Sequence, residues 1–274
     1  MADGTTTPGP ELDAQVAEAA ALLRDARSRV ALTGAGLSVE SGIPPFRGPG
    51  GLWTKYGEPP MDGYQRFLRD PAKAWRERLE PTESWARGLR ETLAAARPNP
   101  GHEALAELER QGLLECVITQ NIDDLHRQAG SRALLEIHGN HRWLRCIECH
   151  RRFEPEALAV DPERLPPLCP ECGGWVKGDT VQFGEPIPPD VLRRCVEAVA
   201  DADCMLLVGT SGTVYPAAEF PIEVLRSGGR LIEVNPYPSE LSELATLSLR
   251  GPAGAVLQRL LRHAARSAEP GRAA

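Results

Sequence analysis

Two Cys-x-x-Cys pairs restrict the fold of this 274-residue chain more than any other feature of its sequence. The pairs are Cys146 with Cys149 and Cys169 with Cys172, and 19 residues separate them. Each pair forms one tight turn, and two such turns bring four sulfurs to one point, as a tetrahedral zinc ion requires. The spacing therefore favours a zinc ribbon over a redox-active dithiol. Four thiolates leave no open coordination position, so we expect one structural zinc ion.

Short apolar runs alternate with helical stretches along most of the chain. Helical spacing of apolar residues predicts helices over 11–27, 102–111 and 191–200, and short, partly β-branched runs predict strands over 29–33, 115–119, 134–138, 205–209 and 230–235. This alternation is typical of an α/β protein whose parallel sheet is covered by helices on both faces. We predict a doubly wound, Rossmann-like sheet that binds its ligand beyond the carboxyl ends of the strands.

Two regions interrupt the alternation and predict a second, smaller lobe. Region 49–98 is rich in tryptophan, proline and arginine, and region 141–178 holds the paired cysteines. We expect the first to be a helical insertion that joins the zinc ribbon of the second. The sheet domain would then be discontinuous, made of 11–48, 99–140 and 179–265. Residues 1–10 are expected to be a disordered lead and residues 266–274 a flexible tail.

Charge and composition exclude several functions. The chain has 31 Lys and Arg against 38 Asp and Glu, and this net charge of −7 argues against a nucleic-acid partner. No apolar run approaches the ~18 residues of a transmembrane helix, and the first ten residues lack the features of a secretory signal. We therefore expect a cytoplasmic monomer without a membrane partner. The three remaining cysteines lie in apolar runs and are expected to be buried: Cys116, Cys195 and Cys204.

A glycine-rich turn, Gly34-Ala35-Gly36, follows the first predicted strand. Such glycines let the backbone approach a pyrophosphate, but Val39 stands where a complete Gly-x-Gly-x-x-Gly has its last glycine, so the motif alone is weak. Polar residues and glycines also end or follow the other four predicted strands: Gln120, Asn121, His138, Gly209, Thr210, Ser211 and Asn235. Because the carboxyl ends of parallel strands share one edge, we expect these residues to line a single crevice.

The longer string Gly34-Ala-Gly-Leu-Ser-Val-Glu-Ser-Gly-Ile-Pro-Pro-Phe-Arg-Gly48 resembles the sirtuin family of NAD-dependent protein-lysine deacylases. Further blocks fit that family: Thr-Gln-Asn-Ile-Asp at 119–123, His-Gly-Asn at 138–140, Phe-Gly-Glu at 183–185, Gly-Thr-Ser at 209–211 and Val-Asn at 234–235. The paired cysteines occur at the place where sirtuins have them. The resemblance covers roughly residues 20–265, points to a bacterial or archaeal type, and implies that the sheet domain binds NAD.

The resemblance implies a reaction and its catalytic residues. In sirtuins the carbonyl oxygen of an acyl-lysine attacks the ribose carbon that carries nicotinamide, which yields nicotinamide, O-acyl-ADP-ribose and deacylated lysine. His138 would be the general base on a ribose hydroxyl, a role that suits imidazole because its ordinary pKa is close to neutral. Asn121 and Asp123 would hold the nicotinamide end and the ribose. The alternatives are a packed strand-end histidine at His138 and simple helix caps at Asn121 and Asp123.

The resemblance also assigns the contacts to NAD and to the substrate. NAD would be bound by Gly34, Ala35, Gly36, Ser38, Phe46, Arg47, Gln120, Asn121, Ile122, Asp123, Gly209, Thr210, Ser211, Asn235 and Ala253. Phe46 would shield the reactive carbon and Arg47 would contact phosphate, unless Arg47 is a plain surface charge. An acyl-lysine protein or peptide would add as a strand beside Val181, Phe183 and Gly184, unless these residues belong to a core strand.

The sequence departs from the family at three places. Pro45 stands where many sirtuins have aspartate, and Gly178 stands where they often have proline. Members that prefer succinyl or malonyl groups carry Tyr-x-x-Arg after the cofactor loop, whereas this chain has Arg78 and Pro81 at the matching positions. A short neutral acyl group, and so deacetylation, is the expected activity.

Three other functions are compatible with parts of this pattern. A protein mono-ADP-ribosyltransferase would use the same activated ribose. A non-catalytic, NAD-sensing zinc-ribbon scaffold is disfavoured by the set Asn121, Asp123 and His138. A zinc-containing alcohol dehydrogenase is disfavoured by the cysteine spacing and the imperfect glycine motif.

Overall fold

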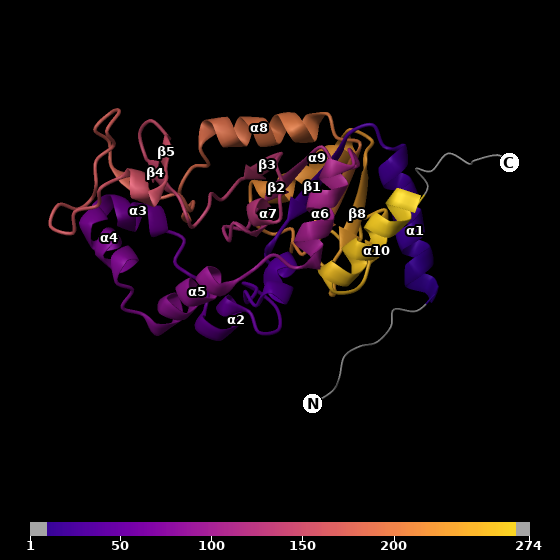
Figure 1. Cartoon of the computed structure of the whole chain (residues 1–274), viewed down its shortest axis with the longest axis horizontal. Coiled ribbons are helices and arrows are strands. Elements are labelled where there is room, and N and C mark those ends of the chain that lie inside the picture. The colour runs from indigo at the N-terminus through magenta and orange to yellow at the C-terminus, as the bar shows by residue number, and fades with distance from the viewer. Residues whose placement is uncertain (1–9, 267–274) are drawn as a thin grey trace.

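The computed structural model describes residues 10–266, and a six-stranded parallel sheet is its centre (Figure 1). The strands are β1 (Arg29–Thr33), β2 (Cys116–Thr119), β3 (Leu134–Glu136), β7 (Cys204–Val208), β8 (Arg230–Val234) and β9 (Leu247–Leu249). They lie in the order β3-β2-β1-β7-β8-β9, with every neighbouring pair parallel. The order reverses between β1 and β7, which confirms the doubly wound sheet and marks the point where such sheets bind ligands.

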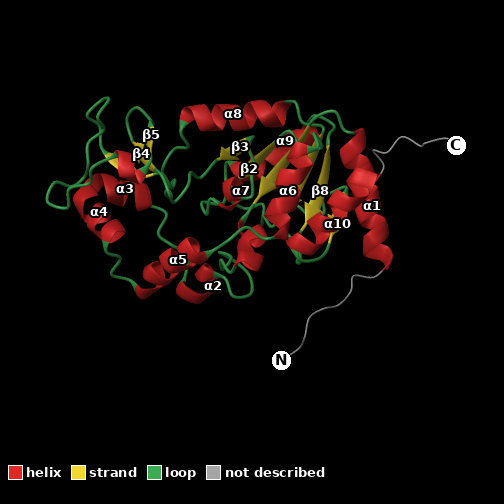
Figure 2. Cartoon of the chain, viewed as in Figure 1, coloured by secondary structure: helices red, strands yellow, loops and turns green. Residues whose placement is uncertain are grey.

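Helices cover both faces of the sheet, as Figure 2 shows. Helices α1 (Pro10–Asp25), α6 (Pro100–Arg110) and α10 (Ala253–Arg266) pack on one face, and α8 (Pro189–Ala200) and α9 (Phe220–Arg226) pack on the other. Successive residues of β1 alternate between the two layers: Ala31 belongs to the first core, and Val30 and Leu32 to the second. Burial on both faces explains why the predicted strands are continuous apolar runs.

A second sheet carries the first cysteine pair at the opposite end of the molecule from α1 and α10 (Figure 1). Its antiparallel strands are β4 (Leu144–Cys146), β5 (Arg152–Phe153) and β6 (Val176–Gly178), in the order β5-β4-β6. Helices α3 (Gly63–Arg69) and α4 (Pro71–Leu79) share one apolar cluster with it. Within this cluster, the indole Nε1 of Trp75 donates to the Val176 carbonyl at 2.6 Å.

The remaining elements are found in the loops of both sheets and in the insertion over residues 49–98. They are η1 (Ala35–Ser41), α2 (Leu52–Tyr56), α5 (Ser84–Ala95), α7 (Leu125–Gln128), η2 (Pro155–Ala157) and η3 (Ala217–Glu219). Between Pro10 and Arg266, no helix combines the length and the apolar character needed to cross a membrane.

The predicted elements agree with the structure except near their ends. Helix α1 begins at Pro10, inside the predicted lead, while residues 1–9 and 267–274 lie outside the described part of the chain. Strand β3 was predicted to reach residue 138 and ends at Glu136, because the chain turns through Gly139 with a φ of +75°. No element was predicted for β9, α9 or α10.

Two buried histidines, His102 of α6 and His126 of α7, pack against each other near the end of β1. Their rings pack edge to face, with centroids 5.0 Å apart. His126 Nε2 lies 2.9 Å from Thr33 Oγ1, whereas His102 Nε2 and His126 Nδ1 have no hydrogen-bond partner within residues 10–266. Burial lowers the pKa of His102 to about 4 and lowers the pKa of His126 well below its usual value. Both rings are therefore neutral at physiological pH.

This pair predicts a loss of stability in acid. The unfolded chain binds a proton at His102 near pH 6.5, but the folded chain does so only near pH 4, so the free energy of unfolding falls as the pH drops through that window. The variant His102→Asn lacks this titration. The free energy of unfolding of the wild type should therefore fall by about 2 kcal/mol relative to that of the variant between pH 7 and pH 5. Urea unfolding of both proteins measures the difference, and a constant difference would contradict the burial of a neutral ring.

Candidate active site

The turn after β1 packs directly against the turn after β7. The Gly34 amide donates to the Val208 carbonyl at 2.9 Å, and the Gly36 amide donates to the Gly209 carbonyl at 2.8 Å. A Cβ atom on Gly36 would lie 2.7 Å from the Gly209 Cα, and Gly209 itself has a φ of +59°. Only residues without a side chain allow this approach. The two turns leave backbone rather than side chains facing the switch point, as the binding of a dinucleotide requires.

Polar side chains tie the ends of four strands together at this point. Gln120, after β2, donates through Nε2 to Thr210 Oγ1 at 2.9 Å. Asn121 Nδ2 donates to the Gly34 carbonyl at 3.0 Å, which links the loops after β2 and β1. Asn235, after β8, donates through Nδ2 to the Thr210 carbonyl at 3.0 Å. The residues predicted to line one crevice therefore do lie together.

Asp123 is held in the same cluster. Its Oδ2 accepts a hydrogen bond from Ser38 Oγ at 2.6 Å, and Ser38 Oγ also accepts one from Asn121 Nδ2 at 3.1 Å. Its Oδ1 accepts the Leu125 amide at 3.0 Å, so the carboxylate also stabilises the start of α7. The pKa of Asp123 lies above its usual value, because burial raises it more than the hydrogen bond from Ser38 lowers it. Asp123 therefore binds both Ser38 of the cluster and the first amide of α7, whereas Asn121 makes no bond to that helix.

His138 follows β3 and lies beside the loop that carries Gln120. Its Nδ1 is 3.2 Å from the Gln120 carbonyl, and because a carbonyl only accepts, this contact assigns the ring proton to Nδ1. Nε2 makes no hydrogen bond to residues 10–266 and is left as a proton acceptor. The pKa of His138 lies below its usual value, because burial lowers it more than the hydrogen bond to the Gln120 carbonyl raises it. The arrangement favours a neutral imidazole that can act as a base.

The loop after η1 brings Phe46 and Arg47 to the edge of this cluster. The Arg47 guanidinium donates to Thr213 Oγ1 at 3.0 Å and lies 4.3 Å from the ring centroid of Trp53. Trp53 also packs against Phe46 and Phe183, at centroid distances of 5.2 and 5.8 Å. Sequence reasoning missed Trp53 and Thr213. The only available signal for Trp53 was its place in a tryptophan-rich insertion, and nothing singled out Thr213.

The segment assigned to the substrate lies next to His138. The Val181 amide donates to the His138 carbonyl at 2.9 Å, and the Phe183 carbonyl accepts the Tyr64 amide of α3 at 3.0 Å. Val181 and Phe183 are half-buried and lie outside all strands, so they are not core-strand residues. Gly184 turns the chain with a φ of +79° beside Gln65. This half-buried segment therefore lies beside the crevice.

Four further predicted residues lie around these contacts. Ala35 is in η1, and Ser211 Oγ lies 2.8 Å from Thr213 Oγ1. The Ile122 carbonyl accepts the His141 amide at 2.8 Å, which joins the loops after β2 and β3. Ala253 is buried at the start of α10. The amide of the next residue, Gly254, donates to Glu40 of η1 at 2.7 Å, and this bond links the start of α10 to the turn after β1.

The four paired cysteines meet the geometric requirement of a zinc site. Their sulfurs all lie within 4.8 Å of one another, with Cys146 and Cys172 at 3.5 Å and Cys149 and Cys169 at 3.7 Å. A tetrahedral site with Zn–S bonds of about 2.3 Å requires S–S distances of about 3.8 Å. The thiolates therefore fit one structural zinc ion. Cys195 and Cys204 are buried as predicted, but Cys116 is only half-buried.

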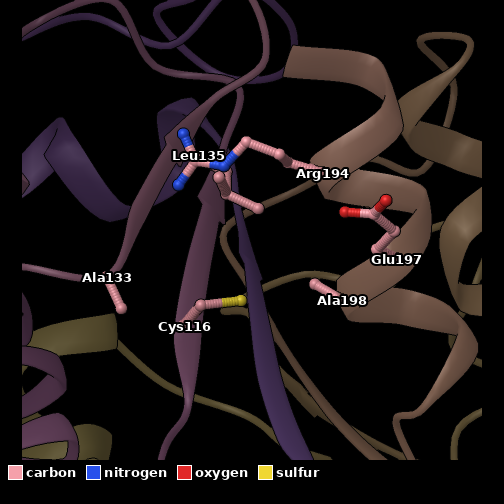
Figure 3. A pocket seen from close by; sticks show the side chains of 6 residues that line it. All are labelled: Cys116, Ala133, Leu135, Arg194, Glu197 and Ala198. Carbon is pink, nitrogen blue, oxygen red and sulfur yellow. The ribbon is translucent and has the colours of Figure 1, made fainter. Parts of the chain in front are cut away.

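Cys116 borders a cavity of about 220 Å³ between α8 and the strand edge, shown in Figure 3. Its other lining residues are Ala133, Leu135, Arg194, Glu197 and Ala198, so none of the predicted site residues contributes to it. A second cavity of about 180 Å³ adjoins the substrate segment at Thr180 and Gln182. Arg78 and Gly178 also line it, and a Cβ on Gly178 would lie 2.9 Å from the Arg78 guanidinium carbon. Two of the three departures from the sirtuin pattern, at Gly178 and Arg78, therefore line one cavity.

The doubly wound sheet, the cluster of backbone and amide groups at its strand ends, and the four-cysteine ribbon together define a nucleotide-binding α/β protein with a structural metal. The chain belongs to the Sir2 family, whose sequence pattern matches residues 34–216. It is 44% identical over 243 residues to NAD-dependent protein deacylase 1 of Archaeoglobus fulgidus, covering 88% of this chain and 94% of that relative. It is 45% identical over 240 residues to NAD-dependent protein deacylase 2 of Pyrobaculum aerophilum, covering 88% and 92%.

Solved structures agree with this placement. A Sir2 homolog in complex with NAD superposes with a TM-score of 0.72 at 42% identity, covering 91% of this chain and 94% of that one. A Sir2 protein with a p53 peptide and NAD+ superposes with a TM-score of 0.73 at 36% identity, covering 91% and 98%. The sirtuin resemblance and its archaeal type are thereby confirmed.

Proposed function

We propose that the crevice around His138 catalyses NAD-dependent removal of acyl groups from lysine side chains. One water molecule is consumed, the products are nicotinamide, O-acyl-ADP-ribose and deacylated lysine, and the chain is an NAD-dependent protein deacylase. Family membership supports the reaction class. The observation that carries the proposal is the free Nε2 of His138 beside the cluster of Gln120, Asn121 and Asp123.

The roles of the crevice residues follow from their positions. NAD supplies a ribose carbon that is activated by its nicotinamide leaving group. His138 Nε2 takes the proton of a ribose hydroxyl, and the Nδ1 contact with the Gln120 carbonyl fixes the ring for that transfer. Asn121 and Asp123 bind the nicotinamide end and the ribose. Phe46, which is 41% exposed, is available to close over the reacting carbon and exclude water.

The other NAD contacts are distributed around the crevice. Arg47 and Ser211 hold phosphate, Asn235 binds the second ribose, and the Ala253 backbone approaches adenine. Gly34, Ala35, Gly36, Ser38, Ile122, Gly209 and Thr210 shape the turns against which NAD lies. Val181, Phe183 and Gly184 receive the peptide as an added strand, because the bond from the Val181 amide to the His138 carbonyl holds their segment beside the general base. An acetyl group is the preferred acyl group, because the chain lacks Tyr-x-x-Arg in 49–98.

The close contact at Gly36 predicts a sensitive position. In Gly36→Ala the added methyl group would lie 2.7 Å from the Gly209 Cα, so the two turns must separate. We expect NAD affinity to fall by about tenfold or more, because the phosphate-binding backbone moves. Calorimetric titration with NAD measures it. Gly88→Ala is the matched control, because a Cβ there meets nothing within 4 Å. Equal NAD affinity in both variants would contradict the proposed NAD site.

Mass spectrometry of acetyl-lysine peptides, with and without NAD, tests the reaction itself. We expect loss of the acetyl group only when NAD is present. Two alternatives give different outcomes. Labelled ADP-ribose that stays on a protein acceptor without deacylation would indicate a mono-ADP-ribosyltransferase, and the absence of nicotinamide release would indicate a non-catalytic NAD-sensing scaffold.

The proposed division into lobes rests on the packing of the chain. Two apolar cores line the large sheet, and a separate cluster joins α3, α4 and the small sheet. We propose 11–48, 99–140 and 179–265 as the NAD-binding domain and 49–98 with 141–178 as the small lobe. A cytoplasmic, monomeric protein without nucleic-acid or membrane partners is proposed as well.

A further inference from the structure

The loop that carries His138 rests on a buried aspartate, Asp179. Gly139 has a φ of +75°, and a Cβ on it would lie 2.8 Å from the Asp179 carbonyl carbon, so the two backbones are in direct contact. The Asn140 amide donates to Asp179 Oδ2 at 2.9 Å. The Val181 amide donates to the His138 carbonyl at 2.9 Å. The segment 179–181 therefore holds the residues on both sides of Gly139.

Two arginines of the small sheet fix Asp179. The Arg145 Nε lies 2.5 Å from Asp179 Oδ1, and the Arg152 Nε lies 2.9 Å from Asp179 Oδ2. Arg145 and Arg152 are paired across β4 and β5, so their guanidinium groups converge from two strands. The Asp179 side chain has no exposed surface, and the Arg145 side chain is 6% exposed. Removing one partner of an ion pair this deeply buried is strongly destabilising.

Arg152 also reaches the end of β3, two residues before His138. Arg152 Nη1 lies 2.8 Å from the buried Glu136 Oε2. Asn140, whose backbone amide binds Asp179, also binds Glu136: its Nδ2 donates to Glu136 Oε1 at 2.5 Å and to Asp124 Oδ1 at 2.8 Å. Buried charges of the large sheet and of the small sheet thus meet at the His138 loop, and their side-chain hydrogen bonds do not include Gln120, Asn121 or Asn235.

We infer that Asp179, held by Arg145 and Arg152, is a positioning residue for His138. The inference rests on the proposed function, because it supplies the orientation that a general base requires. Within residues 10–266 the His138 ring makes one hydrogen bond, to the Gln120 carbonyl, so its place depends on the backbone of 138–140. An ion-paired carboxylate fixes that backbone more rigidly than apolar packing, since each of its bonds has a defined direction. A displacement of about 1 Å at a catalytic group costs on the order of 10²-fold in rate.

The test compares Asp179→Ala, Arg152→Gln and Arg152→Lys in the full-length, zinc-loaded protein at a temperature where each is folded. We expect the kcat for deacetylation of an acetyl-lysine peptide to fall by about tenfold or more in Asp179→Ala and in Arg152→Gln. The Kd of NAD should stay within about threefold of wild type, because the crevice contacts of Gly36, Asn121 and Asn235 do not involve this network. Arg152→Lys keeps the charge and should recover part of the lost kcat.

Asp203→Ala is the matched control. Asp203 also accepts backbone amides, those of Arg27 and Ser28, but it lies at the amino end of β7, away from the crevice. This variant should lose stability and keep the kcat of the wild type. A kcat in Asp179→Ala equal to that of Asp203→Ala would overturn the inference, as would a loss of NAD binding that accounts for the whole defect. If Asp179→Ala does not fold, the pair Arg152→Gln and Arg152→Lys decides, and equal kcat values in the two would overturn it.

His138→Ala separates this inference from the proposed function. Wild-type deacetylation in His138→Ala would refute the general base itself and leave nothing for Asp179 to position. An inactive His138→Ala together with a fully active, folded Asp179→Ala would refute only the positioning role.

Discussion

Replacing His138 with alanine is expected to lower the kcat for deacetylation by about 10²–10⁴-fold, the usual contribution of a general base. The Kd of NAD should change little, since the bonds that join Gly36, Asn121 and Asn235 to neighbouring strands do not involve the imidazole. The physical reason is the free Nε2, which a methyl group cannot replace as a proton acceptor. Steady-state kinetics with an acetyl-lysine peptide and calorimetric titration with NAD measure the two quantities.

His141→Ala is the control for that experiment. His141 lies three residues further along the same loop and is half-buried, but its contact with the crevice loop is made by its backbone amide, to the Ile122 carbonyl. The kcat of this variant should stay within about threefold of wild type, as for most substitutions outside reacting groups. Equal losses in His138→Ala and His141→Ala would show that the loop, and not the imidazole of His138, sets the rate.

Removal of zinc is the second change with a large expected effect. Structural zinc sites contribute on the order of 10 kcal/mol to the folding of small domains, so chelation should unfold the small lobe. A loss of about 5 kcal/mol would already lower the melting temperature by 10 °C or more in a chain of this size. Activity should be lost in parallel, because Arg145 adjoins the ligand Cys146 and holds Asp179 beside the His138 loop.

Cys149→Ser tests the effect of losing the metal separately from the effect of disturbing the core packing. Cys149 is exposed, so the substitution removes a ligand without opening a cavity in the core. Elemental analysis should find one zinc per chain in the wild type and a large reduction in this variant, together with a lower melting temperature. Cys195→Ala, at a buried cysteine outside the cluster, should keep its zinc. An unchanged melting temperature and full activity in metal-free protein would rule out a structural role for zinc.

The sequence predicted the large sheet because its strands are buried on both faces. Residues such as Val30, Ala31 and Leu32 form an unbroken apolar run that only a covered parallel strand explains. Strand β9 was missed because it is three residues long and only partly buried, which leaves too short a pattern. The end of β3 was placed two residues too far because nothing in Ile137-His138 signals that the ladder stops before Gly139 turns.

The crevice residues could be located for a topological reason. Parallel strands end at one edge, so Gln120, Gly209 and Asn235 had to lie near one another, and hydrogen bonds through Thr210 now join Gln120 and Asn235. The network of Arg145, Arg152 and Asp179 could not be predicted in this way. Ion pairs between residues 27 or 34 positions apart follow no period, and arginine is as common on surfaces as in such networks.

The stoichiometry of the reaction products tests the central claim most directly. The protein is incubated with an acetyl-lysine peptide and NAD, and the products are quantified by liquid chromatography and mass spectrometry. We predict nicotinamide, deacetylated peptide and O-acetyl-ADP-ribose in equal amounts, and none of them with His138→Ala above about one hundredth of the wild-type rate. Free acetate in place of O-acetyl-ADP-ribose, or deacetylation without consumption of NAD, would contradict the proposed function.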